Sequence, residues 1–162
     1  AKEVEAKEKK PLKAMLKIFG GFGVLLVIVF SGGIGKLIGN SAVESYNSGN
    51  KELDIEAVLI KKASEYNSKL PMMVDSETQL DSTAILNRTL RYNYSLINFS
   101  YSDISANDFQ SSLKEGVINR VCTTPEMQVF VSNGIKIDFA YYGKAGKLIT
   151  VISVPSSLCE NV

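Results

Sequence analysis

Hydropathy divides the chain into a long apolar run and a domain of shorter alternating segments. Residues 18–35 form an apolar run of 18 residues without a charged side chain. A helix rises about 1.5 Å per residue, so this run spans about 27 Å, close to the thickness of a hydrocarbon core. The pattern predicts a transmembrane helix over residues 18–39, followed by a folded domain over residues 40–162.

The charges on either side of this run predict its orientation. Residues 1–17 hold six lysines and three glutamates, a net charge of +3, and the remaining 145 residues carry −2 of the total of +1. Lysines beside an apolar helix favour the cytoplasmic side, so we expect a basic cytoplasmic tail and a domain outside the cytoplasm. A bacterial inner membrane with a periplasmic domain fits this arrangement.

Two alternatives to a membrane anchor stay open. Small residues follow the apolar run and suit a signal peptidase, which would release the domain by cleavage. The run is also long enough for a buried helix, although its glycines disfavour one. If it does span the membrane, Ser31, Gly35 and Gly39 lie four residues apart and are candidates for helix packing. Glycine is common in membrane helices in general, and this explains the same spacing without a partner.

The rest of the chain alternates between helical and strand periodicity. Apolar residues at three- and four-residue intervals predict helices over residues 51–68, 105–121 and 124–133. Alternation with a period of two predicts strands over residues 78–86, 89–97, 135–142 and 147–154. This order predicts an α+β fold, in which helices pack on one face of a mostly antiparallel sheet of about four strands.

The same patterns predict which faces are buried. In the helix over 51–68 we expect Leu53, Ala57 and Ile60 on one face. In the strand over 78–86 we expect a shared face that consists of Leu80, Ala84 and Leu86. The tyrosines of the later strands face the core in this interpretation, and Asn87-Arg88 forms a tight turn. The two remaining buried sets are Leu90, Tyr92, Tyr94 and Leu96 of a strand, and Phe109, Leu113, Val117 and Val121 of a helix.

Cys122 and Cys159 are the only cysteines of the chain, and both fall in the predicted outer domain. Outside the cytoplasm two such thiols are expected to oxidise to a disulfide. It would close a loop of about 38 residues and stabilise the fold by about 3.5–4 kcal/mol. In a reducing compartment they would instead be two free thiols.

The composition excludes several classes of function. The chain has no histidine, so the commonest general base and metal ligand is absent. Two cysteines cannot build a four-cysteine zinc site, and a near-neutral charge does not suit a nucleic-acid binder. We therefore expect no cofactor, no metal centre and no nucleic-acid partner.

Asp75, Glu77 and Asp81 form the densest acidic cluster of the sequence. The spacing of their carboxylates suggests a weak cation site, but a calcium loop of the EF-hand type needs glycine where Leu80 stands. A solvated turn that leads into a strand is the simpler interpretation.

Four residues near the predicted strands are candidates for an interaction surface. They are Arg88, Arg91, Tyr101 and Tyr142. Arginine and tyrosine are enriched at protein interfaces, because each side chain has a large contact surface and ends in a polar group.

The sequence as a whole suggests a domain that binds rather than catalyses. We expect a membrane-anchored, non-enzymatic binding or assembly domain of the cell envelope. Its partners would be the membrane and other envelope proteins, or a second copy through the transmembrane helix. The alternative is an envelope hydrolase that uses carboxylates, with Asp138 added to the acidic cluster as a candidate.

Overall fold

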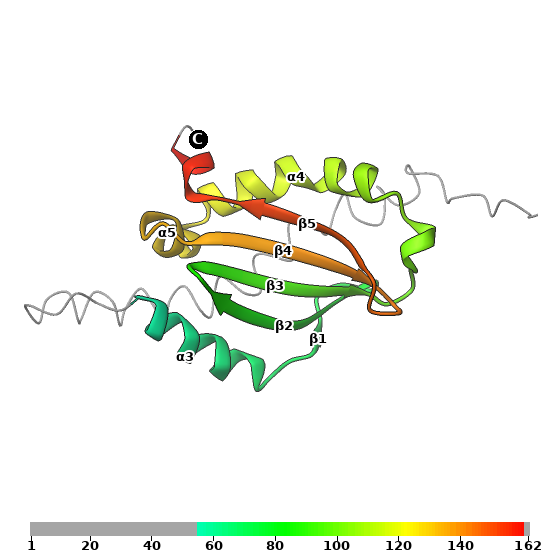
Figure 1. The fold of residues 1–162 in the computed structure, drawn as a ribbon, viewed down its shortest axis with the longest axis horizontal. Helices are drawn as coiled ribbons and strands as arrows, with labels where there is room; N and C mark the ends of the chain where they lie inside the picture. Colours follow the sequence, from blue (N-terminus) through cyan, green and yellow to red (C-terminus); the bar gives the residue numbers. More distant parts are fainter. Residues whose placement is uncertain (1–54, 161–162) are drawn as a thin grey trace, which may run out of the picture.

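A five-stranded sheet forms the centre of residues 55–160, the part of the chain that this computed structural model describes (Figure 1). The strands lie in sequence order, and only the central pair, β3 and β4, is parallel. The predicted α+β class with a mostly antiparallel sheet is confirmed. The strands are β1 (Met72–Met73), β2 (Thr78–Leu86), β3 (Thr89–Leu96), β4 (Lys136–Gly143) and β5 (Leu148–Val154).

The expected number of about four strands is one too few, because β1 was not anticipated. β1 contains two residues, and it pairs with Leu80 and Gln79 of β2. Two residues are too few to show an alternating pattern, so β1 leaves no periodic signal in the sequence.

Three helices flank the sheet. α3 (Ile55–Asn67) precedes the sheet and packs against β2, whereas α4 (Ala106–Thr123) packs against β5 (Figure 1). α4 and α5 (Pro125–Ser132) together connect β3 to β4. Parallel neighbours cannot be joined by a hairpin, so this crossover follows from the parallel pair. Two short 3-10 helices complete the described chain, η1 (Tyr101–Asp103) and η2 (Ser156–Cys159).

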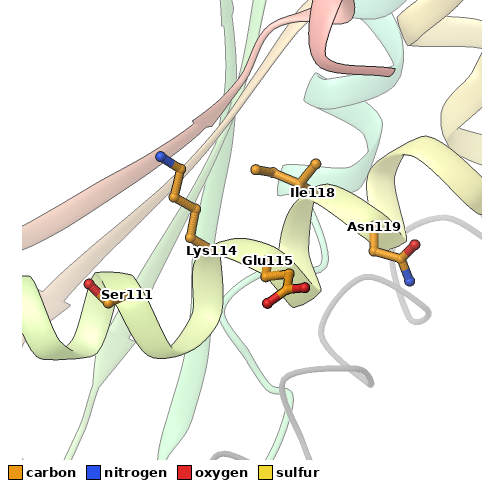
Figure 2. Close-up of a pocket in the computed structure, with 5 residues that line it drawn as sticks. All are labelled: Ser111, Lys114, Glu115, Ile118 and Asn119. Carbon is orange, nitrogen blue, oxygen red and sulfur yellow. The ribbon is translucent and has the colours of Figure 1, made fainter. Parts of the chain in front are cut away.

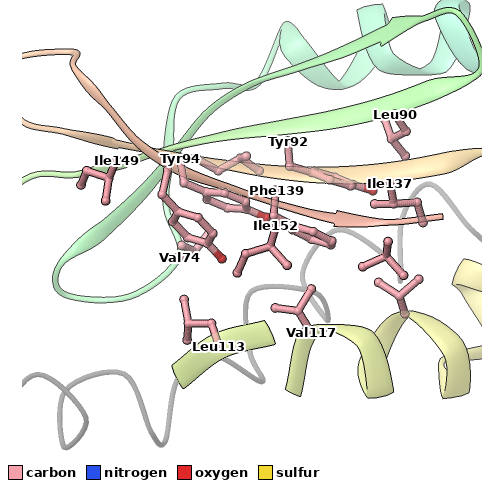
Figure 3. Packing of buried hydrophobic residues seen from close by; sticks show 14 of the residues in the cluster. Val74, Leu90, Tyr92, Tyr94, Leu113, Val117, Ile137, Phe139, Ile149 and Ile152 are labelled. Atoms are coloured by element: carbon pink, nitrogen blue, oxygen red, sulfur yellow. The ribbon is translucent and has the colours of Figure 1, made fainter. Parts of the chain in front are cut away.

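One face of the sheet, called the inner face below, packs against α4. Figure 3 shows Tyr92 and Phe139 of the sheet on the side where Leu113 and Val117 of α4 lie. Leu59 of α3 belongs to the same cluster of buried residues. The expected inner faces of β3 and α4 are confirmed, because all the residues predicted for them are buried.

Aromatic rings run across the middle of the inner face. In the parallel register Tyr92 lies opposite Phe139 and Tyr94 opposite Tyr141, and the ring centroids are 5.4 and 5.3 Å apart. The rings of Phe109 of α4 and Tyr141 form a T-shaped pair, with centroids 5.2 Å apart. Each such pair adds about 0.5–1.5 kcal/mol beyond burial of its area. The parallel register therefore contributes directly to the strength of the core.

The expected face of β2 is wrong beyond Leu80. The register against β3 shifts between Leu80 and Ser82, so one extra residue interrupts the alternation. A shift of one residue turns every later side chain to the opposite face. Thr83 is therefore buried on the inner face, while Ala84 and Leu86 lie on the opposite, outer face, where Leu86 is 70% exposed.

The expected face of α3 is also wrong. Leu59 and Ala63 are buried, whereas Ala57 is exposed and Ile60 is 51% exposed. The Asn67 side chain fixes the end of this helix against β2. Its Nδ2 donates to the carbonyl of Thr83 and its Oδ1 accepts from the N–H of Thr83, both at 2.7 Å. The Asn67 side-chain amide makes the two hydrogen bonds that the backbone of a neighbouring strand would make with Thr83. The helical periodicity of α3 does not reveal this contact.

The tight turn predicted at Asn87-Arg88 is confirmed. Both residues have positive φ angles, 49° and 56°, which is the backbone of a two-residue hairpin turn that follows the twist of its strands. Asparagine tolerates this left-handed conformation better than most residues. The turn sets the register of β2 against β3 at Leu86 and Thr89.

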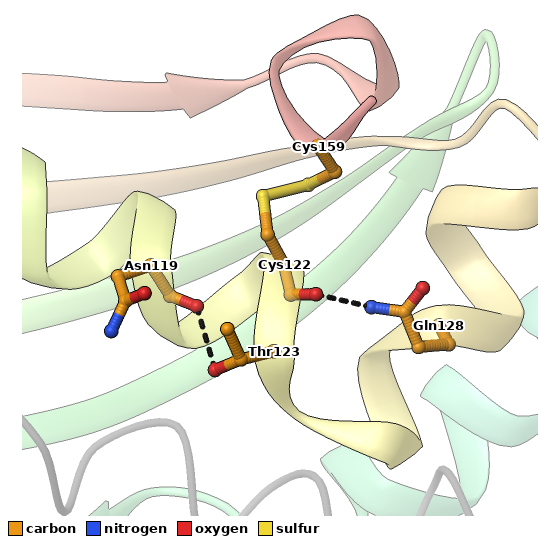
Figure 4. Close-up of a disulfide and its surroundings, with 5 residues drawn as sticks. All are labelled: Asn119, Cys122, Thr123, Gln128 and Cys159. Carbon is orange, nitrogen blue, oxygen red and sulfur yellow. Dashed lines mark hydrogen bonds between the residues drawn. A yellow bond between two sulfur atoms is a disulfide. The ribbon is translucent and has the colours of Figure 1, made fainter. Parts of the chain in front are cut away.

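The predicted disulfide is present (Figure 4). Cys122 near the end of α4 is bonded to Cys159 in η2, and 37 positions separate them in sequence. The carbonyl of Cys122 also accepts a hydrogen bond from Gln128 of α5 at 2.6 Å. The disulfide therefore ties α4 of the crossover to the chain that follows β5.

Within residues 55–160 no helix is both long and apolar enough to cross a membrane. The expected basic tail over residues 1–17 and transmembrane helix over residues 18–39 lie outside the described residues. The same holds for the helix-packing residues Ser31, Gly35 and Gly39, and for Leu53 of the expected helix face. These expectations stay predictions.

Replacing both cysteines, as Cys122→Ser with Cys159→Ser, should lower the free energy of unfolding by about 3.5–4 kcal/mol, because the unfolded chain regains loop entropy. Urea denaturation of the oxidised protein and the variant measures the difference. Reduction of the wild type should reproduce the loss, and the same reductant should leave the double variant unchanged. Equal stability of the two oxidised proteins would contradict this.

The Tyr94 hydroxyl offers a second test of the core. Its oxygen is buried and has no hydrogen-bond partner among the described residues. Tyr94→Phe should therefore raise the free energy of unfolding by about 1 kcal/mol, because it removes an unpaired polar atom. Tyr94→Ala should lower it by roughly 3–5 kcal/mol through loss of the ring. If denaturation shows Tyr94→Phe to be clearly destabilising, the hydroxyl is bonded after all.

Candidate functional site

The outer face of the sheet contains a cavity of about 470 Å³, called the outer-face pocket below. It lies over β2, β3 and β4 at the end where the β2–β3 turn is found. Its described lining residues are Ala84, Leu86, Asn87, Thr89, Arg91, Lys136 and Asp138.

Two features of local structure assemble this pocket. The bulge in β2 turns Ala84 and Leu86 outward, and they form an apolar wall. The parallel register places Arg91 beside Asp138 and Thr89 beside Lys136, which forms a charged wall across β3 and β4. The pocket thus has one apolar and one charged side.

Asp138 is the buried polar centre of the pocket, with a side chain only 2% exposed. Arg91 Nη2 lies 2.9 Å from its Oδ2, and Ser153 donates a hydrogen bond of 2.7 Å to its Oδ1. Lys136 Nζ lies 3.6 Å from Oδ1. Burial by itself raises the pKa of the Asp138 carboxyl, but the hydrogen bonds from Arg91 and Ser153 and the nearby positive charges outweigh it and lower this pKa. Asp138 is therefore ionised at neutral pH.

The two cations of the pocket reach into solvent. The side chains of Arg91 and Lys136 are 45% and 43% exposed. Two positive charges and one negative charge leave the described lining with a net charge of +1. Asp138 thus neutralises one of the two cations, and one positive charge remains at the surface.

The structure separates the four residues predicted as an interaction surface. Arg91 lines the pocket, and Arg88 lies in the adjacent turn, where its guanidinium donates to the carbonyl of Asn133. Tyr142 follows Asp138 by four positions along β4, which is about 13 Å of strand. Tyr101 lies in η1 beneath the Lys147 ammonium, 3.8 Å from its ring centroid. Of the four, only Arg91 is among the described lining residues of the pocket, and Arg88 lies in the turn next to it.

The three carboxylates of the predicted cation site have separate partners. Asp75 Oδ1 accepts from the backbone N–H groups of Glu77 and Thr78, at 2.8 and 2.7 Å. Glu77 accepts from Asn98, and Asp81 accepts from Gln79 and Ser95. Within residues 55–160 no group of three or more acidic, cysteine or histidine side chains is placed to hold a metal ion.

A second cavity, of about 550 Å³, lies along α4 (Figure 2). Its described lining comes from one exposed side of this helix and mixes charged, polar and apolar groups. The residues are Ser111, Lys114, Glu115, Ile118 and Asn119. Because a single helix face supplies them, they form no convergent set of groups.

The geometry gives little support to a carboxylate hydrolase. Such enzymes need two carboxyl groups about 5–10 Å apart, one of them protonated as an acid. Among the described lining residues of the outer-face pocket, Asp138 is the one carboxylate. Its lowered pKa and its pairing with Arg91 suit a structural anion rather than a proton donor.

Sequence reasoning missed most of this pocket. Lys136 shows only as an outward position of a strand, and Ala84 and Leu86 were assigned to the opposite face. The alternation of Lys136 and Asp138 with buried neighbours marks them as one face of β4. It does not reveal that Arg91 lies beside them.

Comparisons with known proteins find a family model that matches the sequence and solved structures that have a similar fold. The family model described as "Domain of unknown function (DUF8479)" matches residues 54–150. This range includes every lining residue of the outer-face pocket. A search of curated protein sequences finds no match.

Two solved structures are similar to the described fold. A protein from Pseudomonas aeruginosa described as secreted has a TM-score of 0.55 and 16% identity, and the match covers 69% of this chain and 100% of that one. A pilotin of the type 2 secretion system from Vibrio vulnificus has a TM-score of 0.53 and 14% identity, with 67% and 94% covered. At these identities the likeness is one of fold alone.

The lowered pKa of Asp138 predicts a pH-dependent contribution to stability. This contribution is full above the ordinary carboxyl pKa of about 3.9 and disappears as the pH falls through the lower value of the folded state. The difference in unfolding free energy between the wild type and Asp138→Asn should therefore be largest near neutral pH and shrink as the pH falls below the ordinary carboxyl pKa.

Urea denaturation at a series of pH values measures this difference. Glu115→Gln, an exposed position of α4, is the control and should show no comparable pH dependence. A difference for Asp138→Asn that stays constant across the series would mean that the native state does not favour the ionised carboxylate.

Proposed function

This chain belongs to the family described as "Domain of unknown function (DUF8479)", and we propose that it is a non-enzymatic protein-binding domain of the cell envelope. In this proposal the outer-face pocket is the surface that contacts a partner protein. The single observation that carries it is the make-up of this pocket, where half-exposed cations stand beside an exposed apolar wall.

The composition of the pocket suits protein recognition better than catalysis. Leu86 is 70% exposed, so burial beneath a partner would remove apolar surface from water. Arg91 is a residue type that is enriched at interfaces and often carries much of the binding energy. Asp138 holds the guanidinium in place, which lowers the entropy lost when a partner binds.

An extracytoplasmic location is supported by two separate observations. The disulfide between Cys122 and Cys159 suits an oxidising compartment. The two structural neighbours are a protein described as secreted and a pilotin of a type 2 secretion system, and both names refer to export. We therefore propose that the domain acts outside the cytoplasm.

The transmembrane helix that the sequence predicts adds a membrane to this proposed location. In this proposal residues 18–39 cross a bacterial inner membrane, residues 1–17 stay in the cytoplasm and the domain lies in the periplasm. The partner is then an envelope protein that meets the domain near the membrane surface. Ser31, Gly35 and Gly39 would allow the membrane helix to pack against a second helix.

Site-specific photo-crosslinking of the full chain in cells tests the proposal. A photoreactive p-benzoylphenylalanine at Leu86 should form an adduct with a protein, because this side chain lies on the wall of the pocket. The matched control carries the same group at Leu148, which is 44% exposed and lies on β5. The adduct should appear at position 86 and not at position 148.

Two results would argue against a partner at the outer-face pocket. One is the absence of any adduct at position 86 in cells that produce the oxidised, folded protein. The other is the same set of adducts from both positions, which would indicate contacts without a defined surface.

A further inference from the structure

We propose that the outer-face pocket binds a single acidic side chain, aspartate or glutamate, of the partner protein. This inference rests on the proposed function and adds the chemistry that the pocket recognises. The acidic group would lie between Arg91 and Lys136, and the aliphatic part of the same segment would pack on Ala84 and Leu86.

The charge balance of the pocket favours a ligand with one negative charge. Its described lining carries a net charge of +1, so one carboxylate neutralises it. A phosphate group carries nearly two negative charges at neutral pH and would leave an excess. A basic or neutral segment would leave the remaining positive charge without compensation.

Both cations keep binding capacity after they contact Asp138. Among the described contacts, Arg91 reaches the carboxylate through Nη2, and the side chain is still 45% exposed. A guanidinium has five N–H donors in a planar fork, so its outer edge remains able to hold a second carboxylate. Lys136 Nζ lies 3.6 Å from Asp138, which is longer than a hydrogen bond, and its ammonium can turn towards a ligand.

The neighbouring charged groups do not cancel this excess. Asp81 lies on β2, where neutral donors of Gln79 and Ser95 hold its carboxylate, and it adds one negative charge near the pocket. Arg88 adds a further positive charge at the turn, where its guanidinium donates to the Asn133 carbonyl. The charges of Asp81 and Arg88 offset each other, so the excess of one positive charge in the described lining remains.

The apolar wall lies close enough to act on the same ligand. Ala84 is paired with Arg91 across β2 and β3, so the two side chains leave the sheet at adjacent positions. Directly opposed residues have Cβ atoms about 4.5–5.5 Å apart. The methylene groups of a glutamate, or the next apolar residue of its segment, can therefore contact Ala84 and Leu86 while the carboxylate meets Arg91.

Nuclear magnetic resonance titration of the full, oxidised chain tests this inference with three peptides. They are acetyl-Leu-Glu-Leu-amide and the same peptide with glutamine or lysine at the centre. The glutamate peptide should shift the amide signals of the pocket residues. The glutamine peptide should bind at least about tenfold more weakly, the size of one charge-assisted hydrogen bond.

Charge reversal provides the decisive variant. Lys136→Glu should reduce the affinity for the glutamate peptide at least about tenfold and raise the affinity for the lysine peptide, because the pocket becomes acidic. The Lys136 side chain is 43% exposed, so a glutamate at this position can extend into solvent. Lys144→Glu makes the same charge change in the β4–β5 loop and is the matched control. It should leave binding of the glutamate peptide unchanged.

A second variant removes both members of the ion pair, so neither Arg91 nor Asp138 is left without its partner. Arg91→Gln combined with Asp138→Asn keeps a net charge of +1 in the pocket but deletes the guanidinium fork. It should weaken binding of the glutamate peptide at least about fivefold, because one carboxylate contact to a cation is lost. Unchanged affinity would overturn the role assigned to Arg91.

The remaining outcomes separate this inference from the proposed function. Equal binding of the glutamate and glutamine peptides, or an equal loss in Lys136→Glu and Lys144→Glu, would overturn recognition of an acidic side chain. Displacement of the glutamate peptide by inorganic phosphate, at a phosphate concentration below that of the peptide, would also overturn it. None of these results would remove a protein adduct at position 86, which tests the surface and not its chemistry.

Discussion

The parallel pairing of β3 with β4 is the constraint on which both faces of the sheet depend. One register sets Tyr92 beside Phe139 on the inner face and Arg91 beside Asp138 on the outer face. Since parallel strands need a crossover, the chain passes through α4 and α5 between them, and α4 covers the aromatic core. A shift of this pairing by one residue would expose the core and bury the charges.

The core and the outer-face pocket are therefore two sides of the same strands. The stacked rings of Tyr92, Tyr94 and Phe139 hold β3 and β4 together from within. The ion pair between Arg91 and Asp138 crosses the same two strands from outside. The disulfide adds a covalent tie between the end of α4 and the chain after β5. These contacts hold the charged wall of the pocket on a rigid support, which suits a site that binds a partner without rearranging.

Much of the fold could be predicted from the sequence, because most of its elements are set by local patterns. The buried stripe of α4 follows helical spacing, and the bounds of β2 and the turn at Asn87-Arg88 follow from alternation and turn chemistry. Two errors have a shared cause. The bulge near Ser82 is decided by the pairing of β2 with β3. The face that α3 buries is decided by its contact with β2, where Asn67 bonds to Thr83.

By itself, the sequence determined the order of the helices and longer strands in the described domain, the disulfide pair and the tyrosine face of β3, since each rests on residues close together or on a unique pair of cysteines. Only the tertiary structure decided how the candidate site is composed. Arg91 and Asp138 are 47 positions apart, and their contact depends on which strands become neighbours and in which direction. Strand pairing of this kind is set by the packing of the whole domain, so no local pattern carries it. The outer-face pocket thus brings together residues that no local sequence pattern marks as a site.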